Sequence, residues 1–306
     1  MDEREWLAER FEEQRAHLKA VAYRMLGSLT EADDAVQDAW LRLNRSGADG
    51  VDNLRAWLTT VVARICLNML RSRNVRREEP LDVHVPDPVI SLEGRVDPEQ
   101  QVLLADSVGL ALQVVLDMLA PDERLAFVLH DMFDMPFNEV AGVVGCSPEA
   151  ARQMASRARR RVRGSAPAPD AELTAQRRVV DAFIAAARGG DLNALVAVLD
   201  PDVVVRSDGG LAQPGATRFV RGAAAVARAA LGGARGGRAS IAMRPALVNG
   251  AAGVILWEGG QPLAVWGFTI AGGKIVEIDA IADPERLRGL GIAPTEPSSA
   301  SRATGR

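Results

Sequence analysis

The spacing of apolar residues predicts that the first quarter of the chain is helical. Apolar side chains recur every three to four positions over residues 6–25, 30–43 and about 54–73, which is the period of an amphipathic helix. Gly27-Ser28 interrupts the pattern after the first helix, and the polar, glycine-containing residues 44–53 predict a loop. We therefore expect a bundle of three helices within residues 5–76.

The second predicted helix has two contrasting faces. Thr30 is expected to cap its N-terminus, where the acidic residues that follow favour the helix dipole. The core face consists of Ala32, Ala35, Val36, Ala39, Trp40 and Leu43. The opposite face consists of Asp34, Gln37, Asp38 and Leu41. On this helix alone, a solvated surface with one exposed leucine is the simplest explanation, and a partner-binding surface is the alternative.

The third predicted helix also carries an unusual strip opposite its core side. The strip holds Thr60, Arg64, Leu67 and Arg71, with Trp57 and Asn68 at its margins. Arginines beside a tryptophan suit phosphate contact combined with stacking on unpaired bases. A solvated basic helix with the tryptophan in the core explains the same pattern equally well.

Residues 99–164 predict four more helices, and the last two have the plan of a helix-turn-helix. A short amphipathic helix ends at Gly145, and Ser147-Pro148 supplies an N-cap and a first-turn proline for the next helix. Such a second helix enters the major groove of DNA. Its predicted outward residues are Glu149, Arg152, Gln153, Ser156, Arg160 and Arg163, with Arg157 and Arg159 on the flanks. The alternative is a solvated arginine-rich helix.

The last segment predicts a different architecture. After a small-residue hinge at 165–171, helical patterns come first, and short strands with Gly-containing turns follow over residues 239–282. Helices followed by a curved antiparallel sheet predict an α+β cone. Residues 172–290 contain no histidine, so the candidate acid–base groups are the isolated acids Asp208, Glu258 and Asp279. The tail after 291 has the composition of a disordered segment.

Composition narrows the possible classes of protein. The 306 residues carry a net charge of −4, yet basic residues cluster at 71–77 and 152–163, which indicates localised contact with a polyanion. The N-terminus has no signal pattern, and no uncharged stretch is long enough for a membrane span. Two distant cysteines and three histidines lack metal-ligand spacing. We expect a cytoplasmic protein with reduced thiols, no metal and no cofactor.

The N-terminal pattern resembles region 2 of bacterial RNA polymerase sigma factors, in the extracytoplasmic-function group. The resemblance is carried by EADDAVQDAWLRL at 31–43 and LRAWLTTVVARICLNMLRSR at 54–73. It implies that the acidic helix docks on the clamp helices of core RNA polymerase through Asp33, Asp34, Gln37, Asp38 and Leu41. It also implies that the melted −10 promoter element is captured by Trp57, Arg64, Asn68 and Arg71.

The helix-turn-helix segment resembles sigma region 4, which reads the −35 promoter element and touches the polymerase flap. The resemblance assigns promoter DNA contacts to Arg152, Gln153, Ser156, Arg157 and Arg160. A mildly acidic chain fits this class, because these sigma factors need polymerase to bind promoters tightly.

The last segment resembles the SnoaL-like domains of the nuclear-transport-factor-like superfamily, some of which are enzymes and others only ligand-binding modules. A subgroup of these sigma factors carries such an extension, with Trp-Leu-Pro-Glu-Pro, Asp-Gly-Gly-Gly-Lys and Asn-Pro-Asp-Lys-Leu motifs. Here Val85–Pro88 keeps Pro86 and Pro88 without the tryptophan. Asp208-Gly209-Gly210 matches the start of the second motif, but the Gly-Lys that ends this motif is missing. Asp283, Pro284 and Leu287 match the third motif conservatively. Ordinary turn chemistry explains the Asp-Gly and Asp-Pro pairs as well.

Together these features predict a multidomain sigma factor with two all-α domains and an α+β SnoaL-like cone. The expected order is region 2 at 5–76, a linker at 77–98, region 4 at 99–164, a hinge at 165–171, the cone at 172–290 and a tail at 291–306. Its fused domain is expected to regulate without a separate anti-sigma partner, and a small ligand of that domain is left open. The rivals are a helix-turn-helix regulator with a ligand-sensing domain and a SnoaL-type enzyme with a DNA-binding appendage.

Overall fold

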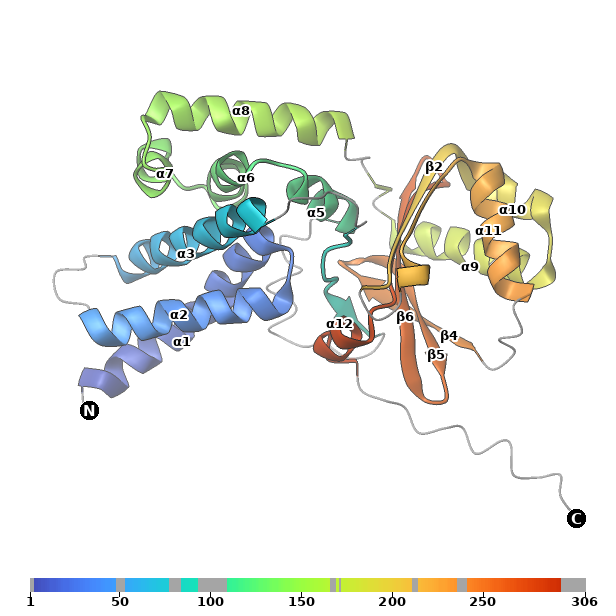
Figure 1. Cartoon of the computed structure of the whole chain (residues 1–306), viewed down its shortest axis with the longest axis horizontal. Coiled ribbons are helices and arrows are strands. Elements are labelled where there is room, and N and C mark those ends of the chain that lie inside the picture. The colour runs from blue at the N-terminus through green and yellow to red at the C-terminus, as the bar shows by residue number, and fades with distance from the viewer. Residues whose placement is uncertain are drawn as a thin grey trace, which may run out of the picture. The chain divides into compact units, whose positions relative to one another are not determined.

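The computed structural model describes residues 3–47, 53–76, 84–92, 109–165, 169–170, 172–210, 214–235 and 241–292 (Figure 1). The chain forms two compact units. The helical unit combines Met1–Leu81 with Val96–Pro167, and the sheet unit combines Asp82–Arg95 with Ala168–Arg306. Residues 93–108, most of the hinge and the tail after 292 lie outside the described residues.

Three helices form the first part of the helical unit, as the apolar spacing predicts. They are α1 (Glu3–Leu26), α2 (Leu29–Ser46) and α3 (Leu54–Arg76). The expected cap of α2 was wrong: Ser28, not Thr30, is the N-cap, and its Oγ accepts a hydrogen bond from the Glu31 amide at 3.5 Å. Gly27 ends α1 with a positive φ of 69°, so the extended cap conformation falls on the next residue.

The predicted core positions of the bundle are largely confirmed. Phe11, Leu18, Val36 and Leu58 are buried, and the rings of Phe11 and Trp40 lie 5.2 Å apart. The outward position of Leu67 was wrong, because this side chain is only 2% exposed.

The second part of the helical unit contains the predicted helix-turn-helix. Its elements are α5 (Leu110–Asp117), α6 (Pro121–Phe127), a π-helical turn (Val128–Met132), α7 (Phe137–Val144) and α8 (Pro148–Ser165). Gly145 ends α7 in the left-handed conformation at φ 84°, and the Ser147 hydroxyl accepts from the Ala150 amide at 3.2 Å. Ala151, Ala155 and Ala158 form the buried side of α8. The glycine turn and the serine cap therefore act as predicted.

A buried arginine joins the two parts of this unit. Arg124 on α6 is 2% exposed, and its Nε and Nη2 donate to the Arg24 carbonyl at 3.0 and 2.9 Å. The fully buried Gln113 donates to the Tyr23 and Arg24 carbonyls, each at 3.3 Å. The last carbonyls of a helix have no partner within that helix, so α5 and α6 satisfy the end of α1. Arg124 also pairs with Asp117.

The sheet unit contains seven strands in the order β1-β4-β5-β6-β7-β2-β3. The strands are β1 (Ile90–Ser91), β2 (Leu199–Asp208), β3 (Arg218–Arg221), β4 (Ala242–Val248), β5 (Ala251–Glu258), β6 (Gln261–Ala271) and β7 (Lys274–Ile281). The helices are α9 (Leu173–Gly189), α10 (Leu192–Val198), α11 (Ala223–Arg235) and α12 (Pro284–Gly289), with a 3₁₀ turn at Pro214–Ala216. The expected α+β domain is confirmed, and the strands within 239–282 pair antiparallel as predicted. The sheet also contains β2, which pairs with β7 in parallel and was not predicted to do so.

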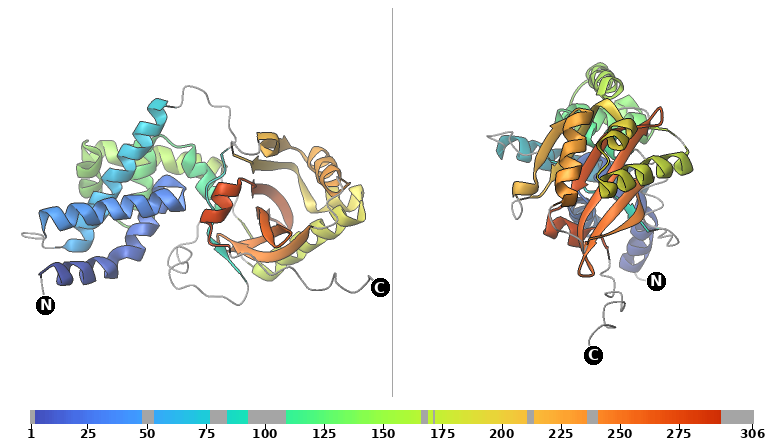
Figure 2. Two further views of the ribbon diagram at one scale, coloured as in Figure 1. Left: turned by 60° about the horizontal axis from the view of Figure 1, so that its bottom comes forward. Right: turned by 90° about the vertical axis from the view of Figure 1, so that its right-hand side faces the viewer.

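The curved sheet has its apolar core on the face that meets α9 and α11 (Figure 2). Phe183 of α9 lies 5.8 Å from Phe268 of β6, measured between ring centroids, and Ile278 of β7 belongs to the same core. Side chains alternate along a strand, so Glu277 and Asp279 belong to the opposite face of β7. The two faces of the sheet thus differ in chemistry.

Two further features bear on the sequence predictions. No helix in the described ranges is long and apolar enough to cross a membrane. The thiols of Cys66 and Cys146 are free, and burial raises the pKa of Cys66 to about 12 despite the opposing charge of Arg124, so this thiol stays protonated at neutral pH.

Candidate functional site

The acidic face of α2 is exposed over its whole length. All five residues assigned to polymerase docking are exposed: Asp33, Asp34, Gln37, Asp38 and Leu41. The side chain of Leu41 is 44% exposed, whereas Val36 and Ala39 on the other side of the helix are buried. Asp33 pairs with Lys19 of α1 at 2.8 Å. One face of α2 is therefore packed into the core, and the opposite face is acidic and exposes one leucine.

The residues assigned to the −10 element lie on one strip of α3, and two of them contact the second part of the helical unit. Arg64 donates to the Gly142 carbonyl of α7 at 2.9 Å. Arg71 donates to Asp122 of α6 at 2.8 and 3.2 Å. Trp57 is half-buried and Asn68 is exposed. The neighbouring α6 and α7 also explain why Leu67, between the two arginines, is buried.

The residues assigned to the −35 element lie on the exposed side of α8. Arg152, Gln153, Ser156, Arg157 and Arg160 are all exposed. The opposite side of α8 packs into the core through its buried alanines, so these polar and basic side chains face solvent. Glu149 in the first turn contacts Arg152 at 3.4 Å.

Residues 84–92, which we call the strap, are held by the sheet unit. β1 pairs antiparallel with the end of β4, where Ile90 stands opposite Val248. Asn249 adds two bonds, because its Oδ1 accepts from the Val89 amide at 2.8 Å and its own amide donates to the Val89 carbonyl at 2.8 Å. These residues fall within the linker expected at 77–98, and their pairing with a strand of the sheet unit was not predicted.

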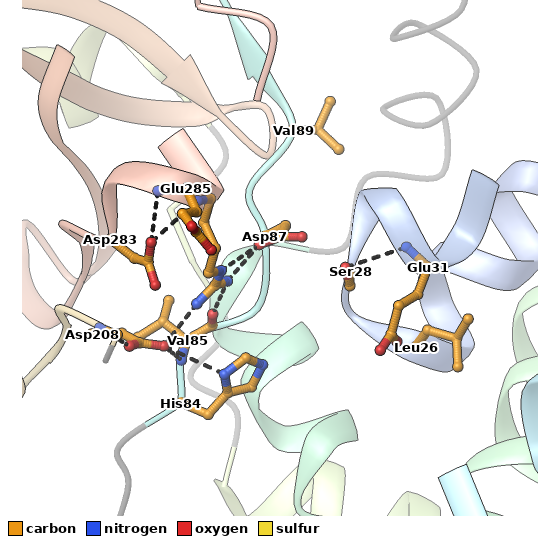
Figure 3. A network of polar contacts seen from close by, with 12 residues as sticks. Leu26, Ser28, Glu31, His84, Val85, Asp87, Val89, Asp208, Asp283 and Glu285 are labelled. Carbon is orange, nitrogen blue, oxygen red and sulfur yellow. Dashed lines mark hydrogen bonds and ion pairs between the residues drawn. The ribbon is translucent and has the colours of Figure 1, made fainter. Parts of the chain in front are cut away.

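A single arginine on α12 connects the strap to the rest of the sheet unit. Arg286 donates to the Asp87 carboxylate from Nε at 2.7 Å and from Nη2 at 2.5 Å, and to the Val85 carbonyl at 2.5 Å. Its Nη1 donates to Asp208 at 2.7 Å. Asp208 also accepts from the Val85 amide at 3.2 Å and lies 3.4 Å from His84 (Figure 3). We call these five residues the strap junction.

The two C-terminal motifs touch each other beside this junction. Asp283 caps α12 by accepting from the Glu285 and Arg286 amides at 2.8 and 3.3 Å. Gly210 has a φ of 60°, and a Cβ added there would lie 1.7 Å from the Asp283 carboxylate. The glycine is therefore required both by its backbone conformation and by this close approach.

The remaining motif residues are also part of this region. Pro86 and Pro88 are buried in the strap, Pro284 occupies the first turn of α12, and Leu287 is buried. Gly209 donates to the Thr217 hydroxyl at 3.1 Å. Segments from three distant parts of the sequence are thus brought together in one unit.

The charge of Asp208 is favoured by its surroundings. Burial opposes that charge, but hydrogen bonds from His84 and from the Gly210 and Val85 amides, with the charge of Arg286, hold the pKa of Asp208 below its ordinary value. The carboxylate therefore remains ionised and keeps its attraction for Arg286.

A second polar cluster lies on the face of the sheet away from α9. Arg206 of β2 bonds to Asp279 at 3.0 Å and to Glu277 at 3.1 Å, both on the neighbouring β7. Burial raises the pKa of Asp279 to about 6; the charge of Arg206 opposes this rise and that of Glu277 adds to it. The sequence-based description of Asp208 and Asp279 as isolated acids was wrong, because each has an arginine partner.

The cluster predicts a pH dependence of stability. The folded chain binds a proton on Asp279 between its ordinary pKa of 3.8 and about 6, where the unfolded chain does not. Stability of the sheet unit is therefore expected to fall as pH rises from 5 to 7.5, by about 1.4 kcal/mol for a pKa of about 6. Thermal unfolding at both pH values measures this. Asp279→Asn should flatten the profile and Asp181→Asn, an exposed control, should not; equal profiles for wild type and Asp279→Asn would contradict the assignment.

Sequence reasoning missed the residues that connect the motifs. Arg286, Asp87 and His84 were not singled out, although Arg286 occupies the position of the lysine in the third family motif. The signal was available: Asp87 and Asp208 are acids in motif positions, and a buried acid needs a cationic partner.

The comparisons with known proteins agree with this arrangement. The sigma-70 region 2 family matches residues 11–76, and the sigma-70 region 4 family matches residues 109–162. The chain is 41% identical to the extracytoplasmic-function RNA polymerase sigma factor SigJ of Mycobacterium tuberculosis, over 91% of this chain and 92% of that protein. It is also 41% identical to the probable sigma factor SigI of the same species, over 63% of this chain and 67% of the relative.

The solved structures extend the likeness to the whole fold. The crystal structure of M. tuberculosis SigJ matches 92% of this chain and 98% of its own, with 38% identity and a TM-score of 0.75. Two sigma regions, the C-terminal α+β domain and their order along the chain are thus shared with one relative. The chain belongs to the extracytoplasmic-function RNA polymerase sigma factors, in the SigJ-like group that carries a C-terminal extension.

Proposed function

We propose that the chain docks on core RNA polymerase through the exposed face of α2 and directs initiation at promoters from there. The observation that carries this proposal is the two-sided construction of α2, in which Asp34, Asp38 and an exposed Leu41 stand opposite a fully packed stripe. An apolar anchor within charged groups is the composition of a protein interface. The clamp helices of polymerase are the partner surface that the family resemblance implies.

Promoter DNA is the second proposed partner. The α3 strip would take the unpaired −10 bases, and α8 would read the −35 element while region 4 touches the polymerase flap. Arg64 and Arg71 are bonded to α7 and α6 in this structure, so DNA would replace these contacts. The location of polymerase and DNA makes the cytoplasm the place where this chain works.

The proposed role of the sheet unit is to regulate the sigma regions by holding the strap. The strap belongs to the segment between the two sigma regions, and the strap junction fixes it through Arg286. Regulation within one chain needs no separate anti-sigma partner, because a tethered domain acts at high effective concentration.

The positions of the acids favour a non-enzymatic sheet unit. In SnoaL-like enzymes the acid–base group lies inside the cone, between sheet and helices. Here Asp208 and Asp279 belong to the other face of the sheet and are paired with Arg286 and Arg206. Glu258 is exposed at the end of β5. These positions support a regulatory module over an enzyme.

Core polymerase decides between the proposed function and its rivals. The purified full-length chain should bind purified core and support transcription from selected fragments of a genomic library. A helix-turn-helix regulator would bind DNA without core and start no transcript, and a SnoaL-type enzyme would turn over a substrate. The sigma proposal fails if the chain neither binds core nor changes which fragments are transcribed.

The regulatory role is tested by removing the central arginine of the strap junction. Arg286→Ala leaves Asp87 and Asp208, both largely buried, without their cation, a loss of about 3–5 kcal/mol for such pairs. We expect hydrogen exchange at the Val85 and Val89 amides to rise at least a hundredfold, and transcription output to change. Arg288→Ala, an exposed arginine of the same helix, is the matched control. If hydrogen exchange at the Val85 and Val89 amides equals that of wild type in both variants, Arg286 does not hold the strap.

A further inference from the structure

Three arginines of α8 are tied to acids of neighbouring elements. Glu123 on α6 accepts from Arg157 Nε at 2.6 Å through one oxygen and from Arg161 Nη1 at 3.1 Å through the other. Asp131 in the π-helical turn accepts from Arg159 Nε at 2.5 Å. None of these acids stood out in the sequence, where only the arginines suggested a DNA contact.

Glu123 is unusual among the acids of this part of the helical unit because it is buried, with 8% of the residue exposed. A carboxylate taken from water is costly unless charged groups pair with it, and here each oxygen has its own guanidinium. The two arginines lie one helical turn apart, so a single buried acid fixes both on the same side of α8.

Both arginine side chains stay accessible to solvent despite these contacts. The side chains of Arg157 and Arg161 remain 44% and 57% exposed. Among the described residues, Arg157 uses only its Nε, so its two terminal nitrogens keep their donors for another partner. A guanidinium held through one nitrogen has lost its rotational freedom before a ligand arrives, which lowers the entropy cost of binding.

We propose that Glu123 is a positioning residue for promoter recognition: it holds Arg157 and Arg161 in the orientation in which α8 meets DNA phosphates or bases. This inference rests on the proposed function, in which α8 reads the −35 element. Glu123 itself does not touch the DNA. Glu123 acts on DNA binding through the two arginines. This positioning effect can be distinguished from the direct repulsion between its negative charge and DNA.

The sign of one substitution separates the two effects. Removing a negative charge near DNA should tighten binding if charge alone matters. If Glu123 positions the arginines, Glu123→Ala should weaken the affinity of holoenzyme for its promoter fragment three- to tenfold, and the slope of log affinity against log salt should become shallower by about one. Glu123→Gln, which keeps an acceptor, should recover part of the affinity.

Glu139→Ala is the matched control, because Glu139 is an exposed acid on α7 of the same helix-turn-helix. It should leave the affinity unchanged or raise it. The fragment is one recovered by transcription with wild-type holoenzyme, so a wild type that selects no fragment counts against the proposed function and not against Glu123 alone. If wild type binds and Glu123→Ala binds equally or more tightly, the positioning role is overturned.

A second variant guards against loss of folding in Glu123→Ala. Arg157→Lys keeps the positive charge but lacks the planar guanidinium, so it cannot bond Glu123 through one nitrogen and offer two others to DNA. It should weaken binding as Glu123→Ala does, and the double variant should be little weaker than either single one. Additive losses, or an affinity of Arg157→Lys equal to wild type, would contradict the proposal.

Discussion

Asp34→Arg is expected to lower the affinity of the chain for core RNA polymerase at least tenfold. Asp34 is exposed on α2, one turn before Asp38 and opposite the packed residue Val36, and the change reverses one charge of the proposed docking face. Loss of one partner from a buried interfacial charge pair costs about 2–5 kcal/mol, and tenfold corresponds to about 1.4 kcal/mol. A binding titration with purified core measures the effect.

The control for this experiment is Asp181→Arg, the same charge reversal at an exposed position of α9 in the sheet unit. It should bind core as wild type does. The buried stripe of α2 is untouched in Asp34→Arg, so its melting temperature should also match wild type. An affinity unchanged by Asp34→Arg would show that polymerase does not use this face.

Arg124→Ala is expected to destabilise the helical unit by about 3–5 kcal/mol, which is the usual cost of removing one member of a buried charged network. The change removes the partner of the Asp117 carboxylate and two of the hydrogen bonds to the Arg24 carbonyl, which keeps the bond from Gln113. It also removes the arginine that joins α6 to the end of α1. Hydrogen exchange of peptides from α1 and α6 reports this loss, and peptides from β5 and β6 serve as the internal reference.

Two variants define the limits of this effect. Arg42→Ala removes an exposed arginine of α2 and should change stability by no more than about 0.5 kcal/mol. Arg124→Lys keeps a buried cation with fewer donors in another geometry, so it should fall between wild type and Arg124→Ala. Equal protection in all four proteins would mean that Arg124 does not join the two parts.

Helix caps and turns within a few residues could be predicted from the sequence alone. The turn at Gly145 and the cap at Ser147 follow from backbone chemistry that acts within a few residues, and both are confirmed. The cap of α2 shows the limit of such rules. Ser28 and Thr30 are both good caps, and only the conformation of Gly27 before them decides which one is used.

Contacts between distant segments could not be predicted from periodicity. Leu67 fits an outward position of α3 until α6 and α7 cover it. The parallel pairing of β2 with β7 joins strands separated by about seventy residues, and no local signal encodes it. The strap junction is the clearest case: each motif alone is explained as a turn, and the contact between them is visible only in the folded chain, where Arg286 bonds both Asp87 and Asp208.

The strap also has a consequence for the order in which a new molecule matures on the ribosome. Asp87 and its partner Arg286 are 199 positions apart, and the helix-turn-helix is complete well before that partner is made. At about 5–20 residues per second, translation from the end of α8 to Arg286 takes on the order of ten seconds. During that interval both sigma regions exist while the strap has at most its pairing with β4 and Asn249, so the strap junction is the last of these contacts to form.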